Sequence, residues 1–246
     1  MNTVSNQSMP TIEIAHQGPE SMKLGVVVAE NLSAERYPSM FESELAKLLN
    51  IRLEELDEAT DLWRRDVRDI FRNGRFKPTG RGKPASEYLL GAARKEAFPR
   101  INSLVDICNY ISLRYVLPIS VCDLDRAGSD TFLVRTGLEG EEYIFNTAGQ
   151  TIGLEDLIIG CSVSGDGTSL PIVNAVKDSM RTKTTPESRR ILALLYAPTV
   201  DPGGRLAQAT REFECLISGC GDAVRTSGAI ASHGESLMLS SNRAEG

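Results

Sequence analysis

Hydrophobic positions along the 246-residue chain fall into short compact runs and into stripes with helical spacing. The runs are rich in valine, isoleucine and leucine, as β-strands are, and turn residues bound many of them. They predict strands at Thr11–Ala15, Leu24–Ala29, Ser120–Leu124, Thr131–Thr136, Glu142–Asn146, Leu157–Cys161 and Ile191–Tyr196.

Apolar residues that recur every three or four positions predict helices elsewhere. The predicted helices are Ser39–Asn50, Leu62–Asn73, one from Asn102 or Ser103 to Tyr115, and Leu206–Ile217. Ser86 is expected to cap a further helix that runs to Lys95. Between them, the glycines and prolines of Gly74–Pro84 predict a loop.

The helix that ends at Tyr115 has one apolar face, and Asp106, Asn109 and Tyr110 are expected to point off it. Helices and short strands are segregated along the chain and do not alternate. This order predicts an α+β fold, a single domain with mixed or antiparallel sheets flanked by helices.

Polar segments at both ends are expected to lie outside that domain. Residues 1–10 are predicted to be disordered, residues 11–222 to form the domain, and residues 223–246 to form a flexible tail. No apolar run approaches the roughly 20 residues of a bilayer span. The N-terminus lacks the basic and apolar segments of a signal peptide, so we expect a cytoplasmic protein with no membrane contact.

The amino-acid composition limits which kinds of catalytic or metal-binding site the chain can form. It contains two histidines, His16 near the N-terminus and His233 in the predicted tail, which disfavours histidine-based triads and metal sites. The five cysteines form no CxxC pair, so we expect buried free thiols and neither disulfides nor a zinc site. No pattern indicates a metal or an organic cofactor. Carboxylates, hydroxyls, backbone groups or the substrate itself would have to carry any catalysis.

Charge is distributed unevenly. The chain carries a net charge of -6, yet Leu62–Arg100 holds eleven basic and four acidic side chains, a local excess of seven positive charges. A basic segment on an acidic body can hold a phosphate backbone in one register. The ordinary alternative is a solvated helix face with internal pairs such as Arg65 with Asp69.

The segment Gly160–Ser169 is rich in glycine and serine, and its residues Ser162–Ser169 are predicted to form a loop. It lacks the lysine of a phosphate-binding P-loop and the strand-to-helix context of a dinucleotide-binding turn. Its backbone N–H groups could approach an anion or a carbonyl oxygen, or the segment could be an ordinary turn.

The segment Pro99–Ile111 is the most specific string in the chain: an arginine and an asparagine lead into a helix, and Asp106 and Asn109 follow one turn apart. Taken singly, these residues fit helix capping and a surface carboxylate. Together they resemble the B3/4 domain, the editing domain in the beta chain of bacterial phenylalanyl-tRNA synthetase, and more closely the free-standing proteins that contain only this domain. The resemblance covers Trp63–Pro198. Supporting matches are Lys77-Pro78, Ser86–Leu90, Leu117–Asp123, Leu138–Glu141 and Val176–Thr184.

The resemblance implies hydrolysis of a wrong amino acid from tRNA, acting in trans, because no segment resembles an aminoacylation domain or an ATP site. Asn109 matches the asparagine of the family site, and Arg100 stands one place from the family arginine. Ser120 replaces a histidine of the synthetase pocket, which leaves the amino-acid specificity open, and Asp123 matches an aspartate. The terminal ribose hydroxyl of tRNA could move the proton in a site this poor in histidine.

From the resemblance and the charge pattern we assign candidate roles. The expected catalytic groups are Asn109, Ser120 and the backbone N–H groups of Gly165 and Gly167. The expected substrate contacts are Arg100, Asn102, Asp106, Asp123, Thr168 and Asp178. The expected contacts to the tRNA acceptor end are Arg64, Arg68, Arg72, Arg75, Lys77, Arg81, Lys83, Lys177, Arg181 and Lys183.

A second hypothesis is a non-catalytic module that binds RNA, or an amino acid or another small metabolite, on the same fold. The lost histidine and the acidic overall charge favour it. The partners expected are therefore tRNA and an amino-acid moiety, and no protein partner can be named.

Overall fold

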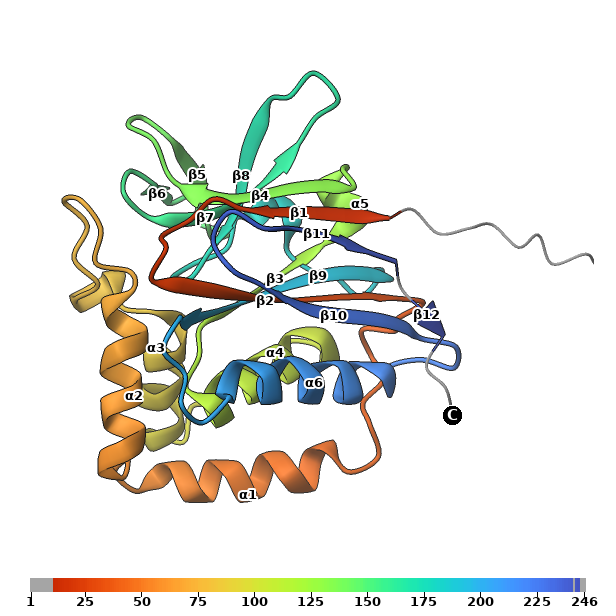
Figure 1. Cartoon of the computed structure of the whole chain (residues 1–246). Coiled ribbons are helices and arrows are strands. Elements are labelled where there is room, and N and C mark those ends of the chain that lie inside the picture. Colours follow the sequence, from red (N-terminus) through yellow and green to blue (C-terminus); the bar gives the residue numbers. More distant parts are fainter. Residues whose placement is uncertain (1–10, 241, 244–246) are drawn as a thin grey trace, which may run out of the picture.

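The computed structural model describes residues 11–240, 242 and 243. The predicted disordered segment 1–10 lies outside the described residues. In the described part the chain folds into two stacked five-stranded sheets, and the large helices lie beneath the second sheet (Figure 1). The first sheet has the order β11 (Ser236–Leu239), β1 (Ile12–His16), β4 (Thr131–Thr136), β7 (Ile158–Val163) and β8 (Ser169–Asn174). The second has the order β12 (Asn242–Arg243), β10 (Arg225–Ala231), β2 (Met22–Glu30), β9 (Arg190–Pro198) and β3 (Ile119–Asp123).

Strand pairing is mixed, because β1 runs parallel to β4 while the other pairs within the two sheets are antiparallel. A small hairpin of β5 (Glu142–Ile144) and β6 (Thr151–Gly153) stands beside the first sheet. Together with the helices these sheets confirm the predicted α+β class.

The helices pack in a layer on the open face of the second sheet. They are α1 (Phe41–Leu53), α2 (Glu58–Asp69), α3 (Ala85–Arg94), α4 (Ser103–Tyr115) and α6 (Arg205–Ser218). The short α5 (Leu124–Ala127) lies apart from this layer, beside the first sheet (Figure 1). Single 3-10 turns at Gly80–Gly82 and Met180–Thr182 interrupt the loops.

The core lies where β2 and β9 run between the first sheet and helices α4 and α6 (Figure 1). Both strands are covered on both faces, which explains why they read as continuous apolar runs without alternation. Gly25 on β2 lets α6 approach closely: a Cβ atom there would stand 2.7 Å from Thr210 Oγ1 and 2.9 Å from Leu206 Cδ1.

Some helix starts differ from the prediction because the capping residue was not identified from the sequence pattern. The Asp57 side chain accepts a hydrogen bond from the Thr60 N–H, so α2 begins at Glu58, four residues before the predicted start. Ser86 is not a cap: α3 begins one residue earlier, and the buried Ser86 hydroxyl has no hydrogen-bond partner among the described residues. Asn102 caps α4 as expected, accepting from the Val105 N–H at 3.0 Å.

The residues expected to point off the apolar face of α4 are mostly inside. Asp106 and Tyr110 are buried, because α4 packs against neighbours on several sides, and Asn109 is half-buried.

The predicted flexible tail from residue 223 is wrong for the described residues. β10 pairs with β2 along seven residues and β11 pairs with β1. The glycine and serine content that suggested disorder instead serves packing, since a Cβ atom at Gly228 would collide with the Glu214 carboxylate on α6. The domain therefore extends at least to Leu239.

No helix in the described ranges has the length and apolar character needed to cross a membrane. The five cysteines are free thiols, and all except Cys215 are buried, as predicted.

Candidate functional site

A pocket of about 680 Å³ opens between α3, the loop that precedes it, and the segments that follow β5, β8 and the second 3-10 turn. We call it the Asp178 pocket. Its wall combines four cationic side chains, two aromatic rings and two carboxyl groups: Arg81, Lys83, Lys177, Lys183, Tyr88, Phe145, Glu87 and the half-buried Asp178. Its volume lies within the range of about 300–1,000 Å³ that is usual for small-molecule sites.

Asp178 is the group with the most altered acid–base chemistry in this wall. Its Oδ1 accepts a hydrogen bond from the Asn174 N–H at 3.2 Å. Burial raises the pKa of the Asp178 carboxyl to about 7, although hydrogen bonds from Ser120, Asn174 and Val121 and the charge of Lys183 favour the ionised form. This carboxyl can therefore take up or release a proton near neutral pH.

A buried polar layer supports Asp178 from behind. The Ser120 hydroxyl lies within hydrogen-bonding reach of the Asp178 carboxyl and of the Asn174 carbonyl oxygen, 3.0 Å away. The Tyr196 hydroxyl donates to Ser120 Oγ at 3.3 Å. The Asn174 amide donates to the Tyr143 hydroxyl at 2.6 Å. Burial, with the nearby Asp178 charge, raises the pKa of both tyrosines, so both phenols stay protonated and can donate.

Asn174 also shapes the turn that carries Asp178. Its side-chain oxygen accepts hydrogen bonds from the N–H groups of Val176 and Lys177 at 2.7 and 2.8 Å. The Tyr143 hydroxyl closes the arrangement by donating to the Lys177 carbonyl oxygen at 2.8 Å. The position of Asp178 is thus fixed by side chains of β3, β5, β8 and β9.

The cations of the pocket differ in their partners. Lys183 Nζ donates to the Phe145 carbonyl oxygen at 2.7 Å, and Lys177 Nζ lies over the Phe145 ring, 4.0 Å from its centroid. Arg81 and Lys83 line the mouth, and within the described part of the chain neither has an ion-pair or hydrogen-bond partner for its side chain. Two positive charges at the mouth are therefore available to an anionic ligand.

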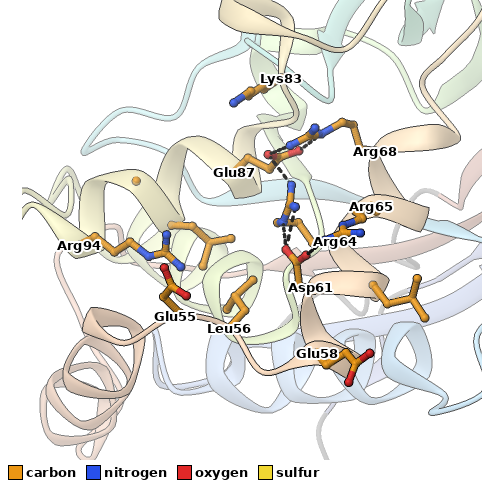
Figure 2. Close-up of a pocket in the computed structure, with 13 residues that line it drawn as sticks. Glu55, Leu56, Glu58, Asp61, Arg64, Arg65, Arg68, Lys83, Glu87 and Arg94 are labelled. Atoms are coloured by element: carbon orange, nitrogen blue, oxygen red, sulfur yellow. Dashed lines mark hydrogen bonds and ion pairs between the residues drawn. The ribbon is translucent and has the colours of Figure 1, made fainter.

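A second hollow of about 820 Å³ lies between α2 and α3, and Lys83 and Glu87 line both hollows (Figure 2). We call it the α2–α3 groove. Glu87 is bound by Arg64, at 3.0 Å, and by Arg68 through two hydrogen bonds. Asp61 pairs with Arg64 at 2.7 Å and with Arg65. Arg64, Arg65 and Arg68 thus point at carboxylates of the same groove, which neutralise much of their charge (Figure 2).

Comparison with known proteins decides the family. A profile of the B3/4 domain matches residues 77–200, half of the chain. The chain belongs to the B3/4 domain family. The family suggested by the sequence is thereby confirmed.

Two relatives are similar to this B3/4 protein. The phenylalanine–tRNA ligase beta subunit of Oceanobacillus iheyensis is 36% identical over 59 residues, which are 24% of this chain and only 7% of that subunit. The crystal structure of an N-terminal fragment of the phenylalanyl-tRNA synthetase beta subunit from Pyrococcus horikoshii aligns with a TM-score of 0.41 at 8% identity, covering 88% of this chain and half of that one.

The structure brings together only part of the residues predicted to form the site. Asp178, Lys177, Lys183, Arg81 and Lys83 line the Asp178 pocket. Ser120 lies directly behind Asp178 but is buried and does not line the pocket, so within this arrangement it can position Asp178 and cannot itself reach a ligand.

Arg100, Asn102 and Asp106 form a separate, structural network at the start of α4. Asp106 accepts hydrogen bonds from Arg100 Nε at 2.7 Å, from the Ile101 N–H and from the Tyr37 hydroxyl. Arg100 also pairs with a glutamate of α1. Asn102 caps α4 and donates to Thr184 Oγ1 at 3.2 Å. This network joins α1 to α4 and lines neither the Asp178 pocket nor the α2–α3 groove.

Asp123 is also a structural residue. It caps α5 through the Arg126 N–H at 3.0 Å and accepts a hydrogen bond from the buried Ser188 hydroxyl.

The Gly165–Thr168 segment is the exposed turn of the β7–β8 hairpin, which projects from the first sheet in Figure 1. The Gly167 N–H is used within the turn, donating to the Ser164 carbonyl oxygen at 2.8 Å. Strand β8 separates this turn from Asn174, and six residues of strand span about 20 Å. The expected grouping of Gly165, Gly167 and Thr168 with Ser120 is therefore wrong.

Asn109 remains a prediction. It lies half-buried on α4, on the same narrow strip as Asn102 and Val105, and its side chain makes no hydrogen bond within the described residues.

The basic residues predicted to contact RNA are more neutralised than their number suggests. Arg72 pairs with Asp69, and Arg75 pairs with Glu155 from a distant segment. Arg65 pairs with Asp61 and not with Asp69, the partner expected from the sequence. Lys77 and Arg181 are exposed.

The two histidines lie together, away from the pocket wall. His16 is buried, with Nε2 donating to the Met22 carbonyl oxygen at 3.0 Å and Nδ1 accepting from the Gly18 N–H at 3.1 Å. Burial lowers the pKa of His16. His233 hydrogen-bonds the Gly18 carbonyl oxygen, so both rings serve the β1–β2 turn. Within the described residues, no three acidic, cysteine or histidine side chains are grouped so as to hold a metal ion.

Sequence reasoning missed Tyr88, Tyr143, Asn174 and Tyr196. One usable signal was Tyr196 in a fully apolar strand, because a buried phenol needs a hydrogen-bond partner. Another was Asn174, a polar residue at the end of an apolar run with a carboxylate four residues on.

Proposed function

We propose that this B3/4 protein is a hydrolase that removes the amino acid from a mischarged tRNA, acting in trans. The observation that carries the proposal is the Asp178 pocket, in which a carboxyl with a pKa of about 7 lies beside four cations. Membership of the B3/4 family and similarity to a subunit named for phenylalanine–tRNA ligation support it.

The charges of the pocket suit an aminoacyl nucleotide. Phosphate groups near the acceptor end would contact Arg81 and Lys83, which lack partners of their own within the described chain. The amino-acid moiety would enter toward Asp178. Because phosphate contacts release counterions, binding would weaken as salt is raised.

Hydrolysis needs little catalytic assistance from the site, because an aminoacyl ester is already activated. Water attacks the ester carbonyl carbon and gives a proton to ionised Asp178. The bond between that carbon and the ribose oxygen then breaks, and the ribose oxygen leaves as a hydroxyl by taking that proton back from Asp178. A general base with a pKa near the working pH contributes about 10²–10⁴ in rate. Ser120 and Tyr196 are positioning residues that orient the Asp178 carboxyl through hydrogen bonds.

The experiment is a deacylation assay on a panel of correctly and wrongly charged tRNAs. We expect selective release from one mismatched pair and a loss of about 100-fold or more in Asp178→Asn. Asp222→Asn is the matched control, because Asp222 is highly exposed and pairs with Arg36, away from both hollows. Hydrolysis that survives Asp178→Asn unchanged would remove Asp178 from the mechanism, and no hydrolysis of any pair by the folded protein would exclude the activity.

Asn109 has its own test. Asn109→Ala should reduce hydrolysis more than tRNA binding if it contacts the reacting group. An equal fall in both, or no change in either, would remove it from the site.

One observation favours a second candidate, a non-catalytic module that binds RNA, an amino acid or a small metabolite. The backbone N–H groups expected to stabilise the oxyanion lie on the β7–β8 turn, away from Asp178. Thermal shift with free amino acids distinguishes the two, since a ligand at 100 times its Kd adds about 2.7 kcal/mol of stability. A shift without any deacylation would favour this candidate.

A further inference from the structure

Tyr88 is a large aromatic side chain left in solvent at the mouth of the Asp178 pocket. It is 72% exposed, while the next residues on α3, Leu89 and Leu90, are buried in the core. Within the described residues its hydroxyl has no hydrogen-bond partner and its ring contacts no other ring or cation. Helix packing therefore does not account for a tyrosine at this position.

The surroundings of Tyr88 are cationic. Arg81 and Lys83 line the same pocket, and neither is engaged by a carboxylate in the described chain. In contrast, Arg64 and Arg68 of the neighbouring groove are held by Glu87. The unpaired charges of Arg81 and Lys83 and the exposed ring of Tyr88 thus line the same pocket.

An exposed ring beside unpaired cations is the combination that binds single-stranded nucleic acid, because bases stack on the ring while phosphates contact the cations. We infer that Tyr88 is a stacking platform for an unpaired base at the end of an RNA strand, with Arg81 and Lys83 holding the adjoining phosphates. The inference rests on the proposed function and deepens it, since it makes an unpaired RNA end the part of the substrate recognised.

Phe145, the other ring of the pocket, is less suited to this role. The Lys177 ammonium already lies over it, 4.0 Å from the ring centroid. Bases in the interior of a duplex are already stacked on both faces, so a single exposed ring favours an unpaired base over paired ones.

The test compares affinities for a short unstructured RNA and for the same sequence in a blunt duplex, measured by fluorescence anisotropy at low salt. The full-length protein should bind the single strand more tightly. Tyr88→Ala should weaken that binding about 5- to 150-fold, the range for loss of one stacked base. Tyr88→Phe should retain it, because the ring and not the hydroxyl stacks.

Arg81→Ala with Lys83→Ala should weaken binding and lower the slope of log affinity against log salt by about 0.7 for each phosphate that the protein no longer neutralises. Met238→Ala is the matched control, an exposed apolar side chain on β11 that lines neither hollow. An acidic peptide of equal charge should bind far more weakly than RNA.

Wild-type affinity in Tyr88→Ala would overturn the inference, and so would an acidic peptide that binds as tightly as RNA with the same dependence on Tyr88. Deacylation by the wild type with unchanged kcat/KM in Tyr88→Ala would refute the stacking platform and leave the proposed function standing. Tyr88-dependent binding of single-stranded RNA without any deacylation would refute the proposed hydrolase and leave the stacking platform standing.

Discussion

Asp178→Asn should change how stability depends on pH, in addition to its effect on activity. The ordinary pKa of an aspartate is 3.8, and burial raises that of Asp178 to about 7 in the folded protein. Between these values the unfolded chain loses the proton while the folded chain keeps it. The folded state therefore binds more protons than the unfolded state, and stability falls as pH rises through this window.

The magnitude follows from the two pKa values. A tenfold difference between the two acid dissociation constants corresponds to about 1.4 kcal/mol, so above pH 7 the full cost of ionising Asp178 is about 4 kcal/mol. Between pH 5 and pH 8, the wild type should lose about 3 kcal/mol relative to Asp178→Asn, which has no charge to bury at this position. The amide oxygen of the variant can still accept from the Asn174 N–H, so the local fold should be kept.

The assay is urea unfolding at pH 5 and pH 8, monitored by fluorescence of Trp63, the single tryptophan. Trp63 is buried and donates to the Tyr115 carbonyl oxygen at 2.9 Å, so its emission reports loss of the core. Taking the difference between the two proteins cancels other groups such as His16, whose lowered pKa has the opposite effect. Parallel pH dependences in the two proteins would refute the reasoning, because Asp178 would then ionise at its ordinary pKa and would be a much weaker base near neutrality.

Four further outcomes are expected. The rate of deacylation should rise with pH and level off above about 7, as Asp178 loses its proton; a rate that is flat across pH 5–8 would contradict this base. Gly25→Val should destabilise the fold by about 1–3 kcal/mol in urea unfolding, since the added carbons would overlap Thr210, and an unchanged midpoint would contradict the close packing. Deleting residues 223–246 should lower the melting temperature sharply or prevent folding, because β10 and β11 leave with them; a truncated protein as stable as the full chain would show that they are dispensable. Glu87→Gln should raise affinity for RNA and steepen its salt dependence by freeing Arg68 of α2, while Arg64 keeps its pair with Asp61; unchanged binding would place the α2–α3 groove outside the RNA contact.

The sequence was most informative where one physical signal dominated. β4 was predicted with its observed bounds, and β2 and β9 were found because strands covered on both faces are continuously apolar. The start of α2 was missed because its cap, Asp57, lies within an acidic stretch that resembles a surface loop. β10 was missed because small residues such as Gly228, needed where α6 crosses it, have the composition of a disordered tail.

For the candidate site too, some residues could be recognised from the sequence and others could not. Asp178, Lys177 and Lys183 belong to one short segment, and all three line the Asp178 pocket, although the sequence predicted different contacts for the carboxylate and the lysines. Asp106 and Asp123 were misjudged because a polar residue at the start of a helix looks the same in sequence whether it binds a ligand or caps the helix. The tyrosines of the buried layer come from separate strands, and only the fold brings them to Asp178.

The pairing of the last strands with the first has a consequence for synthesis. Ile230 lies opposite Gly25 and Leu239 opposite Ile12, so the strand pairing of the first sheet is not complete until Leu239 has been made. At about 5–20 residues per second, roughly 200 residues must be added after β2 leaves the ribosome, a delay of about 10–40 s. During that time the edges of β1 and β2 that later receive β11 and β10 remain open to pairing with other chains. The nascent protein is therefore expected to depend on chaperones that cover exposed strand edges, and to aggregate when translation stalls before β10.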